Sequence, residues 1–151
     1  MGLGGESYKK SVIEDFAEAI SSFNIEGVAI LLADDGSFAV QDENHKIVIA
    51  GKDEFLDWLR GCYSKLFFGG RLRRRLSFNI VQCLHHVAGN PVIVFDKGRF
   101  PAFSHKKEKN SQSGLVIKAD EKIVTGVELC LLVKKIEKPY IYEKRCLKPD
   151  L

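Results

Sequence analysis

Three side chains of this sequence are candidates for proton transfer in a catalytic site: Asp42 and the adjacent histidines His85 and His86. A histidine in a pocket can act as a general acid or base near neutral pH, and a carboxylate can act as a base. Residues 76–85 alternate in polarity, which predicts a strand, so the two imidazoles point to opposite faces of a sheet and only one can enter a pocket. The competing interpretation is structural: an inert surface histidine, and a turn-forming aspartate.

Sulfur chemistry is the second possibility. The four cysteines are Cys62, Cys83, Cys130 and Cys146, and no two of them form a C-x-x-C pair. The spacing of Cys83 and His85 is not that of a zinc site. We therefore expect four reduced thiols, no metal site and no cofactor.

Charge is distributed unevenly along the chain. Residues 1–60 contain 12 acidic and 5 basic residues, whereas residues 61–151 contain 8 acidic and 18 basic ones. The run from Arg71 to Arg75 could contact phosphates. However, no recognition-helix or aromatic RNA-binding motif accompanies it, so we expect a solvated strand end and no nucleic-acid partner.

Length and composition indicate an ordinary globular protein. The chain has 151 residues, of which 45% are hydrophobic and 28% charged, and no apolar run approaches the length of a membrane span. We expect a flexible segment over residues 1–6, one domain over 7–138 and an edge strand or tail over 139–151. The absence of a signal-peptide pattern favours a cytoplasmic protein without membrane contact.

Three helices are predicted in the first half of the chain. Ser7 or Ser11 caps the first, whose apolar positions follow helical spacing as far as Phe23, and Asn24 caps the second, over residues 25–32. Residues 33–36 end that helix, and a hairpin follows, with strands over 37–41 and 46–50 and a turn over 42–45. The third helix begins at residues 51–53 and ends at the glycines 69–70.

The second half of the chain is rich in strands. We expect strands over 76–85, over 92–95 with a possible continuation to 103, over 115–119 and over 123–133, a polar loop over 105–113, and a last edge strand or tail at 140–142. Helices followed by antiparallel strands define an α+β fold, with the helices packed on one face of a curved antiparallel sheet.

Several segments of the first 70 residues resemble the nuclear transport factor 2-like superfamily, which includes ketosteroid isomerases, scytalone dehydratase and polyketide cyclase-like (SnoaL-like) proteins. The resemblance is carried by the following segments: Phe16-Ala17-Glu18-Ala19-Ile20, Asn24-Ile25-Glu26-Gly27-Val28, Leu31-Leu32-Ala33-Asp34-Asp35 and Gly51-Lys52-Asp53-Glu54-Phe55. It implies a cone-shaped, cystatin-like fold: three N-terminal helices pack on a strongly curved antiparallel sheet around an apolar pocket. It also implies a homodimer that pairs through the sheet.

The residues that ketosteroid isomerases use for catalysis do not carry over. The positions of the tyrosine, the base and the second acid are Phe16, Val40 and the neighbourhood of Leu115, none of which can move a proton. The familiar isomerase mechanism is therefore not expected. Dehydratases of this class use histidine with aspartate, which keeps His85, His86 and Asp42 as catalytic candidates for metal-free acid–base chemistry.

Two functions remain open at this point. The first is a pocket protein that holds a small apolar or amphipathic molecule between helices and sheet. The residues expected to line its pocket are Phe16, Ile20, Val40, Trp58, Tyr63, Phe78, Cys83 and Phe95. The alternative is a non-catalytic dimerisation or protein-interaction module, which would expose apolar residues on the outer face of its sheet.

Overall fold

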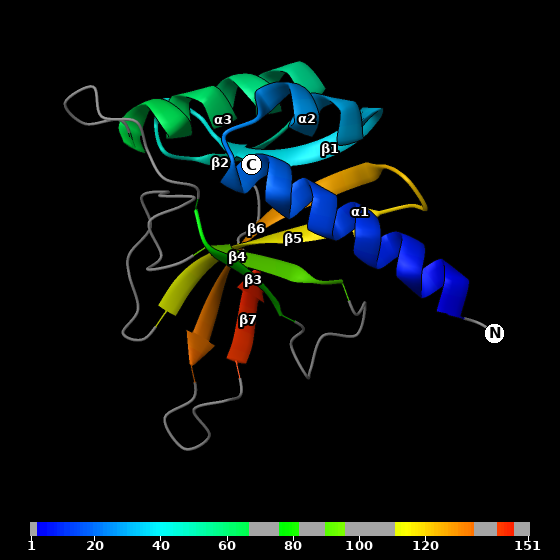
Figure 1. Cartoon of the computed structure of the whole chain (residues 1–151). Coiled ribbons are helices and arrows are strands. Elements are labelled where there is room, and N and C mark those ends of the chain that lie inside the picture. Colours follow the sequence, from blue (N-terminus) through cyan, green and yellow to red (C-terminus); the bar gives the residue numbers. More distant parts are fainter. Residues whose placement is uncertain (1–2, 67–75, 82–89, 96–110, 135–141, 147–151) are drawn as a thin grey trace.

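Three helices cover one face of a seven-stranded sheet (Figure 1). The computed structural model describes residues 3–66, 76–81, 90–95, 111–134 and 142–146. The helices are α1 (Leu3–Ser21), α2 (Ile25–Leu31) and α3 (Lys52–Leu66). The strands are β1 (Leu32–Gln41), β2 (Ile47–Ala50), β3 (Phe78–Val81), β4 (Val92–Phe95), β5 (Ser111–Ala119), β6 (Val124–Lys134) and β7 (Tyr142–Cys146).

The sheet is mixed, which corrects the prediction of an antiparallel sheet. The strand order is β2-β1-β6-β5-β4-β3, and β7 pairs with β6 outside this path. All neighbouring strands are antiparallel except β1 and β6, which run parallel. Alternating polarity tells which face a side chain occupies but not which strand lies beside it, so this distant pairing left no local signal.

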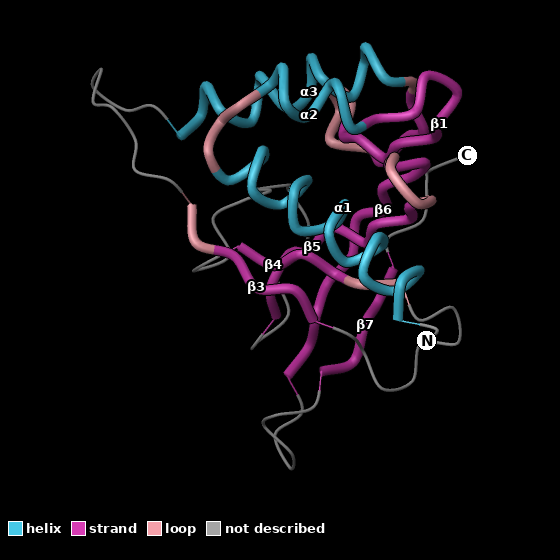
Figure 2. The backbone as a smooth tube through the Cα atoms, turned by 45° about the vertical axis from the view of Figure 1, so that its right-hand side comes forward, coloured by secondary structure: helices cyan, strands magenta, loops and turns pink. Residues whose placement is uncertain are grey.

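The arrangement of elements is consistent with the fold that the sequence resembles: two helices, a hairpin, a third helix and a run of strands. The sheet is not strongly curled, however, so neither the strong curvature nor the cone shape is confirmed (Figure 2). In both ribbon views the helices lie together on one side of the strands.

The helix starts are confirmed in one case and corrected in another. Asn24 caps α2 as expected: its side-chain oxygen accepts a hydrogen bond of 2.9 Å from the amide of Gly27. By contrast, α1 begins at Leu3, before the expected caps Ser7 and Ser11 and inside the segment expected to be flexible. Glycine weakens a helix without forbidding it, and no proline precedes this helix to stop it.

Strand β1 starts earlier than the sequence predicts. It begins at Leu32, directly after α2, and therefore contains Asp34 and Asp35, which the sequence pattern placed in a turn. Its register against β6 shifts between Leu32 and Ser37, so the two aspartates lie in an irregular stretch. Such a bulge uses the same residue types as a turn, which explains the misassignment.

Two more strand limits differ. Strand β5 begins at Ser111, although residues 105–113 were expected to form a loop. The last strand, β7, is described from Tyr142 to Cys146, and the start expected at residue 140 lies outside the described residues. The turn at residues 42–45, the start of helix α3 and strand β4 follow the prediction, and β2 begins one residue later than expected. The end expected for the third helix at residues 69–70 lies outside the described residues.

The sheet separates two apolar clusters. The larger cluster lies between helices and sheet and includes Phe16, Phe38, Phe55 and Phe95, all with no exposed surface. The smaller one comprises Val92, Val94, Val116, Cys130 and Leu132. Along β3 and the residues before it, Leu76, Phe78 and Ile80 belong to the helix side, whereas Val81 belongs to the other cluster, as period-2 alternation predicts.

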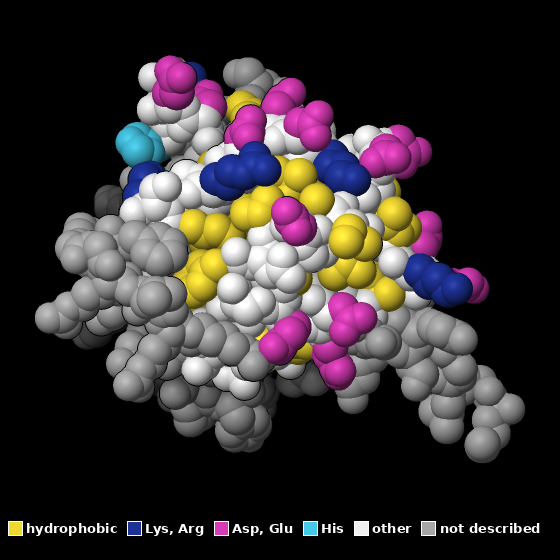
Figure 3. Space-filling model, turned by 45° about the horizontal axis from the view of Figure 1, so that its top comes forward, with side chains coloured by type: hydrophobic (Ala, Val, Ile, Leu, Met, Phe, Trp, Pro, Cys, Tyr) yellow, Lys and Arg dark blue, Asp and Glu magenta, His cyan; other side chains and the backbone are white. Residues whose placement is uncertain are grey.

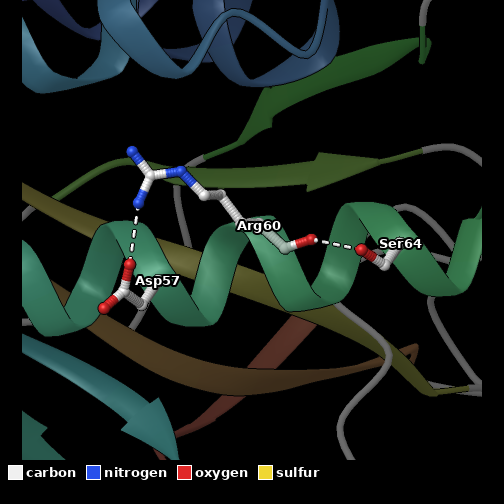
Figure 4. A network of polar contacts seen from close by, with 3 residues as sticks. All are labelled: Asp57, Arg60 and Ser64. Carbon is white, nitrogen blue, oxygen red and sulfur yellow. Dashed lines mark hydrogen bonds and ion pairs between the residues drawn. The ribbon is translucent and has the colours of Figure 1, made fainter.

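The outer face of α3 is polar and solvated (Figure 4). Arg60 forms an ion pair of 2.7 Å with Asp57, and the hydroxyl of Ser64 donates to the carbonyl of Arg60 at 3.1 Å. The opposite stripe of α3 places Phe55 and Leu59 in the core. This amphipathic pattern fixes which side chains of α3 face the sheet.

Candidate functional site

The end of α1, the second half of α3 and the start of β3 meet at one place. The phenol of Tyr63 on α3 donates a buried hydrogen bond of 2.7 Å to the carbonyl of Ile20. The amide of Leu76, two residues before β3, donates to the carbonyl of Ser21 at 2.9 Å. These two bonds satisfy carbonyls at the C-terminal end of α1 that have no partner within the helix.

Aromatic rings surround this junction. The ring of Phe23 lies edge-on against Tyr63, with centroids 5.0 Å apart. The ring of Phe78 on β3 lies 6.4 Å from that of Phe95 on β4, also edge-on. Phe23 and Phe78 are only partly buried, whereas Tyr63 and Phe95 are buried. Apolar surface at the junction therefore reaches solvent.

The helix-facing side of β3 is partly exposed. In the described part of the chain, α3 packs mainly on β1, and α1 packs on β5 and β6. Leu76, Phe78 and Ile80 pack against the larger cluster but remain half-buried. We call these three side chains the β3 rim. The β3 rim thus contacts the buried core and also presents apolar surface to solvent.

The structure brings most of the expected lining residues together. Phe16, Ile20, Val40 and Phe95 lie in the larger cluster with 0–6% of their surface exposed. They pack with the other apolar side chains of that cluster. Trp58 is half-buried and packs against Phe55, with ring centroids 5.8 Å apart.

Two titratable groups border the junction, and both stay protonated at neutral pH. Burial raises the pKa of the Cys62 thiol from 9.0 to about 11, against a smaller opposing effect of Lys65. Burial also raises the pKa of the Tyr63 phenol, and the neighbouring Cys62 adds to the effect. A thiol in this state is a poor nucleophile, and the Tyr63 hydrogen already goes to a carbonyl. Both groups are therefore protonated, and mainly buried, at neutral pH.

Asp42 lies away from the junction, in the turn between β1 and β2. Its carboxylate accepts hydrogen bonds from the amides of Asn44 at 2.8 Å and Lys46 at 3.0 Å. The side chain is exposed. These contacts are those of a turn-forming aspartate, the structural interpretation of this residue.

His85, His86 and Cys83 lie outside the described residues, as does the basic run from Arg71 to Arg75. The positions that correspond to isomerase catalytic residues are described, and the side chains of Phe16, Val40 and Leu115 are all apolar and buried in the larger cluster. Within the described ranges, no group of three or more His, Cys, Asp or Glu side chains is arranged to hold a metal ion.

The sequence analysis missed part of this site. Leu76, Ile80 and Phe23 were not among the expected lining residues, although the first two share with Phe78 the alternation that predicts one strand face. That alternation could have identified them. Phe23 has a positive φ of 61° at the end of α1, and no sequence pattern signals where its ring points.

Comparisons with known proteins give distant likenesses only. No protein-family model matches the chain, and no curated protein matches it. Among solved structures it is similar to a ketosteroid isomerase-like protein from Erwinia carotovora atroseptica, with 14% identity and a TM-score of 0.37 over 93% of this chain and 94% of that one.

Two further structures show a comparable likeness. A DUF4783 family protein from Bacteroides uniformis shares 17% identity, with a TM-score of 0.33 over 91% of this chain and 97% of that one. A protein of unknown function from Mycobacterium tuberculosis shares 13% identity, with a TM-score of 0.34 over 95% of this chain and 74% of that one. No residue or activity is carried over from these likenesses.

One further property concerns membranes. Among the helices of the described residues, none combines the length and the apolar character that crossing a bilayer requires.

Proposed function

We propose that this protein binds a small apolar or amphipathic molecule between its helices and the helix-facing side of its sheet. The observation that carries the proposal is the β3 rim. Leu76, Phe78 and Ile80 face the helical layer but remain half-buried, next to a core of fully buried aromatic and aliphatic side chains. A ligand that enters there buries apolar surface that is now partly in contact with water.

The polar groups of the described junction are already engaged. The carbonyls of Ile20 and Ser21 accept hydrogen bonds from Tyr63 and Leu76. The walls are thus mainly apolar, which favours an apolar or amphipathic ligand over a highly charged one. In this proposal a single pocket histidine, His85 or His86, supplies the polar contact and any acid–base chemistry.

The alternative, an interaction module that pairs through the outer face of its sheet, has less support. That interpretation requires exposed apolar side chains on the outer face. Val92, Val94, Val116 and Leu132 on that side are 0–6% exposed in the single chain. Among the described residues, the exposed large apolar side chains are instead Ile30 on α2 and Ile49 on β2, at 78% and 52%. Figure 3 shows hydrophobic side chains among charged ones on the surface of the molecule.

The first test is native mass spectrometry of the purified protein, followed by denaturing extraction and analysis of any small molecule that is released. We expect a retained apolar molecule with one copy per chain. If nothing is retained, titration with 8-anilinonaphthalene-1-sulfonate is the second measurement. Trp58 is the single tryptophan of the chain, so its emission reports binding near α3.

A matched pair of variants locates the site. Phe78→Ser removes a rim side chain, and Asn79→Ser changes the next residue, which is exposed on the other side of β3. We expect Phe78→Ser to weaken binding of the extracted molecule or the probe at least tenfold and Asn79→Ser to leave it unchanged. Equal affinities in two folded variants, or no binding by either measurement, would contradict the proposal.

A further inference from the structure

Two cysteines occupy directly opposite positions on neighbouring strands. Strand β7 pairs with the C-terminal half of β6, and in this register Cys146 lies directly opposite Cys130. Residues directly opposite in an antiparallel pair have Cα atoms about 4.5–5.5 Å apart. A disulfide bridges Cα atoms about 4.4–6.8 Å apart, so the backbone already has the spacing that a cross-strand disulfide needs.

On the side of β6 that pairs with β5, Cys130 has close apolar neighbours. Cys130 is fully buried in the smaller cluster, beside Val92 and Leu132. The residue opposite it in β5 is Gly114. A Cβ atom at Gly114 would lie 3.2 Å from the Cys130 sulfur and 2.7 Å from a methyl group of Val92. The glycine thus prevents crowding of the Cys130 sulfur.

A covalent link between β6 and β7 would strengthen the attachment of β7 to the sheet. On one edge β6 pairs with β5 along its length, and on the other edge it pairs first with β1 and then with β7. In the described part of the chain, β6 is the only strand that β7 pairs with. The attachment of β7 to the sheet therefore depends on a single five-residue ladder.

We propose that Cys130 and Cys146 form an oxidisable pair whose cross-strand disulfide fastens β7 to β6. With oxidised glutathione as the oxidant, the thiolate of one cysteine attacks a sulfur of the small disulfide and expels one glutathione thiolate. The second cysteine, as a thiolate, then attacks the protein-bound sulfur, forms the intramolecular bond and releases the second glutathione. The two thiol protons go to the two released thiolates, so the two cysteines are oxidised and one small disulfide is reduced.

Whether all four thiols are reduced then depends on the redox state of the surroundings. In a reducing compartment the pair stays open, and β7 pairs with β6 without a covalent link. In an oxidising environment the pair closes. Because Cys130 is buried, attack by glutathione requires β7 to separate from β6 briefly, which a short terminal ladder permits.

The test starts from the fully reduced, folded protein, which is treated with oxidised glutathione and digested without reduction. We expect one disulfide-linked peptide pair that contains Cys130 and Cys146, with Cys62 unlinked to either. Closing a loop of this size raises the midpoint of thermal unfolding by roughly 6–12 °C, and reduction reverses the shift. Cys146→Ala lacks both the linked peptides and the shift, whereas Cys62→Ala retains both.

Three results would overturn the proposal. The first is a Cys130 that remains a thiol after prolonged oxidation of the folded protein. The second is a Cys146 found only as a glutathione adduct or linked to Cys62 or Cys83. The third is a thermal midpoint that rises equally in Cys146→Ala, because the rise would then have another cause. Circular dichroism establishes that each variant is folded before oxidation.

Discussion

The phenolic oxygen of Tyr63 lies 2.7 Å from the main-chain carbonyl oxygen of Ile20 and donates a buried hydrogen bond to it. This bond joins α3 to the last turn of α1, and the ring of Phe23 packs edge-on against the same phenol. Tyr63 therefore links the two helices beside the β3 rim through one buried hydrogen bond.

Replacing Tyr63 with phenylalanine tests this role. Tyr63→Phe keeps the ring and removes the donor, and the Ile20 carbonyl then keeps only its bond from the Phe23 amide. We expect a loss of about 0.5–1.5 kcal/mol in the free energy of unfolding, measured with urea. Ser64→Ala is the matched control, because its exposed hydroxyl bonds only within α3. Equal free energies of unfolding for Tyr63→Phe and the unmodified protein would show that this hydrogen bond does not stabilise the fold.

Stability is expected to fall at alkaline pH because of Cys62. Its pKa is 9.0 when unfolded and about 11 in the folded protein, so the unfolded chain loses the thiol proton first. The contribution is complete below pH 9 and is lost as the pH rises from 9 to about 11, at a cost of about 2 kcal/mol. Tyr63 changes stability in the same direction at still higher pH, since its pKa is also raised.

Cys62→Ala separates the two groups. In this variant the decline between pH 9 and about 11 should shrink, while the contribution of Tyr63 persists. The measurement is the free energy of unfolding by urea across this pH range, under reducing conditions. A decline of the same size in Cys62→Ala would assign it to other groups.

Local patterns predicted the elements of this fold better than their pairing. Helical spacing and the Asn24 cap located α2, and alternation assigned Phe78 and Val81 to opposite faces. The parallel pairing of β1 with β6 joins residues about 90 positions apart, such as Phe38 and Val127, and no local pattern encodes it. The bulge at residues 32–37 likewise depends on β6.

The sequence predicted the apolar character of the candidate site but not how its residues lie relative to one another. Phe16, Ile20 and Phe95 were expected to line a pocket; all three are buried between helices and sheet, and their role as lining residues stays a prediction. The bond from Tyr63 to Ile20 spans 43 residues and involves a main-chain carbonyl, which has no residue-type signature. The β3 rim also depends on which strands the helices leave uncovered, a property of the packed molecule.

Substitutions of Asp42 distinguish a structural role of this residue from a catalytic one. Its carboxylate accepts two main-chain hydrogen bonds in the β1–β2 turn. We expect Asp42→Ala to lower the free energy of unfolding by about 1 kcal/mol in a thermal or urea experiment. Glu43→Ala changes an exposed neighbour in the same turn and should have little effect. If turnover of an extracted ligand is found and Asp42→Asn abolishes it without loss of stability, the residue acts as a base.

Gly36 is required where β1 passes closest to β6. A Cβ atom there would overlap the ring of Phe38 and lie 2.9 Å from the carbonyl oxygen of Thr125 on β6. The carbonyl belongs to the backbone of a paired strand and cannot move away without breaking the parallel pairing, so we expect Gly36→Ala to destabilise the protein by about 1–3 kcal/mol.

Gly61 supplies the matched control, because a Cβ atom there meets nothing within 4 Å and the residue lies inside α3. Alanine is the better helix former, so Gly61→Ala should stabilise the protein by about 0.5–1 kcal/mol. The same substitution thus has opposite signs at two glycines, as measured by urea unfolding. If Gly36→Ala leaves the free energy of unfolding unchanged, β1 can shift against β6, and the close approach to Thr125 does not fix the register of the two strands.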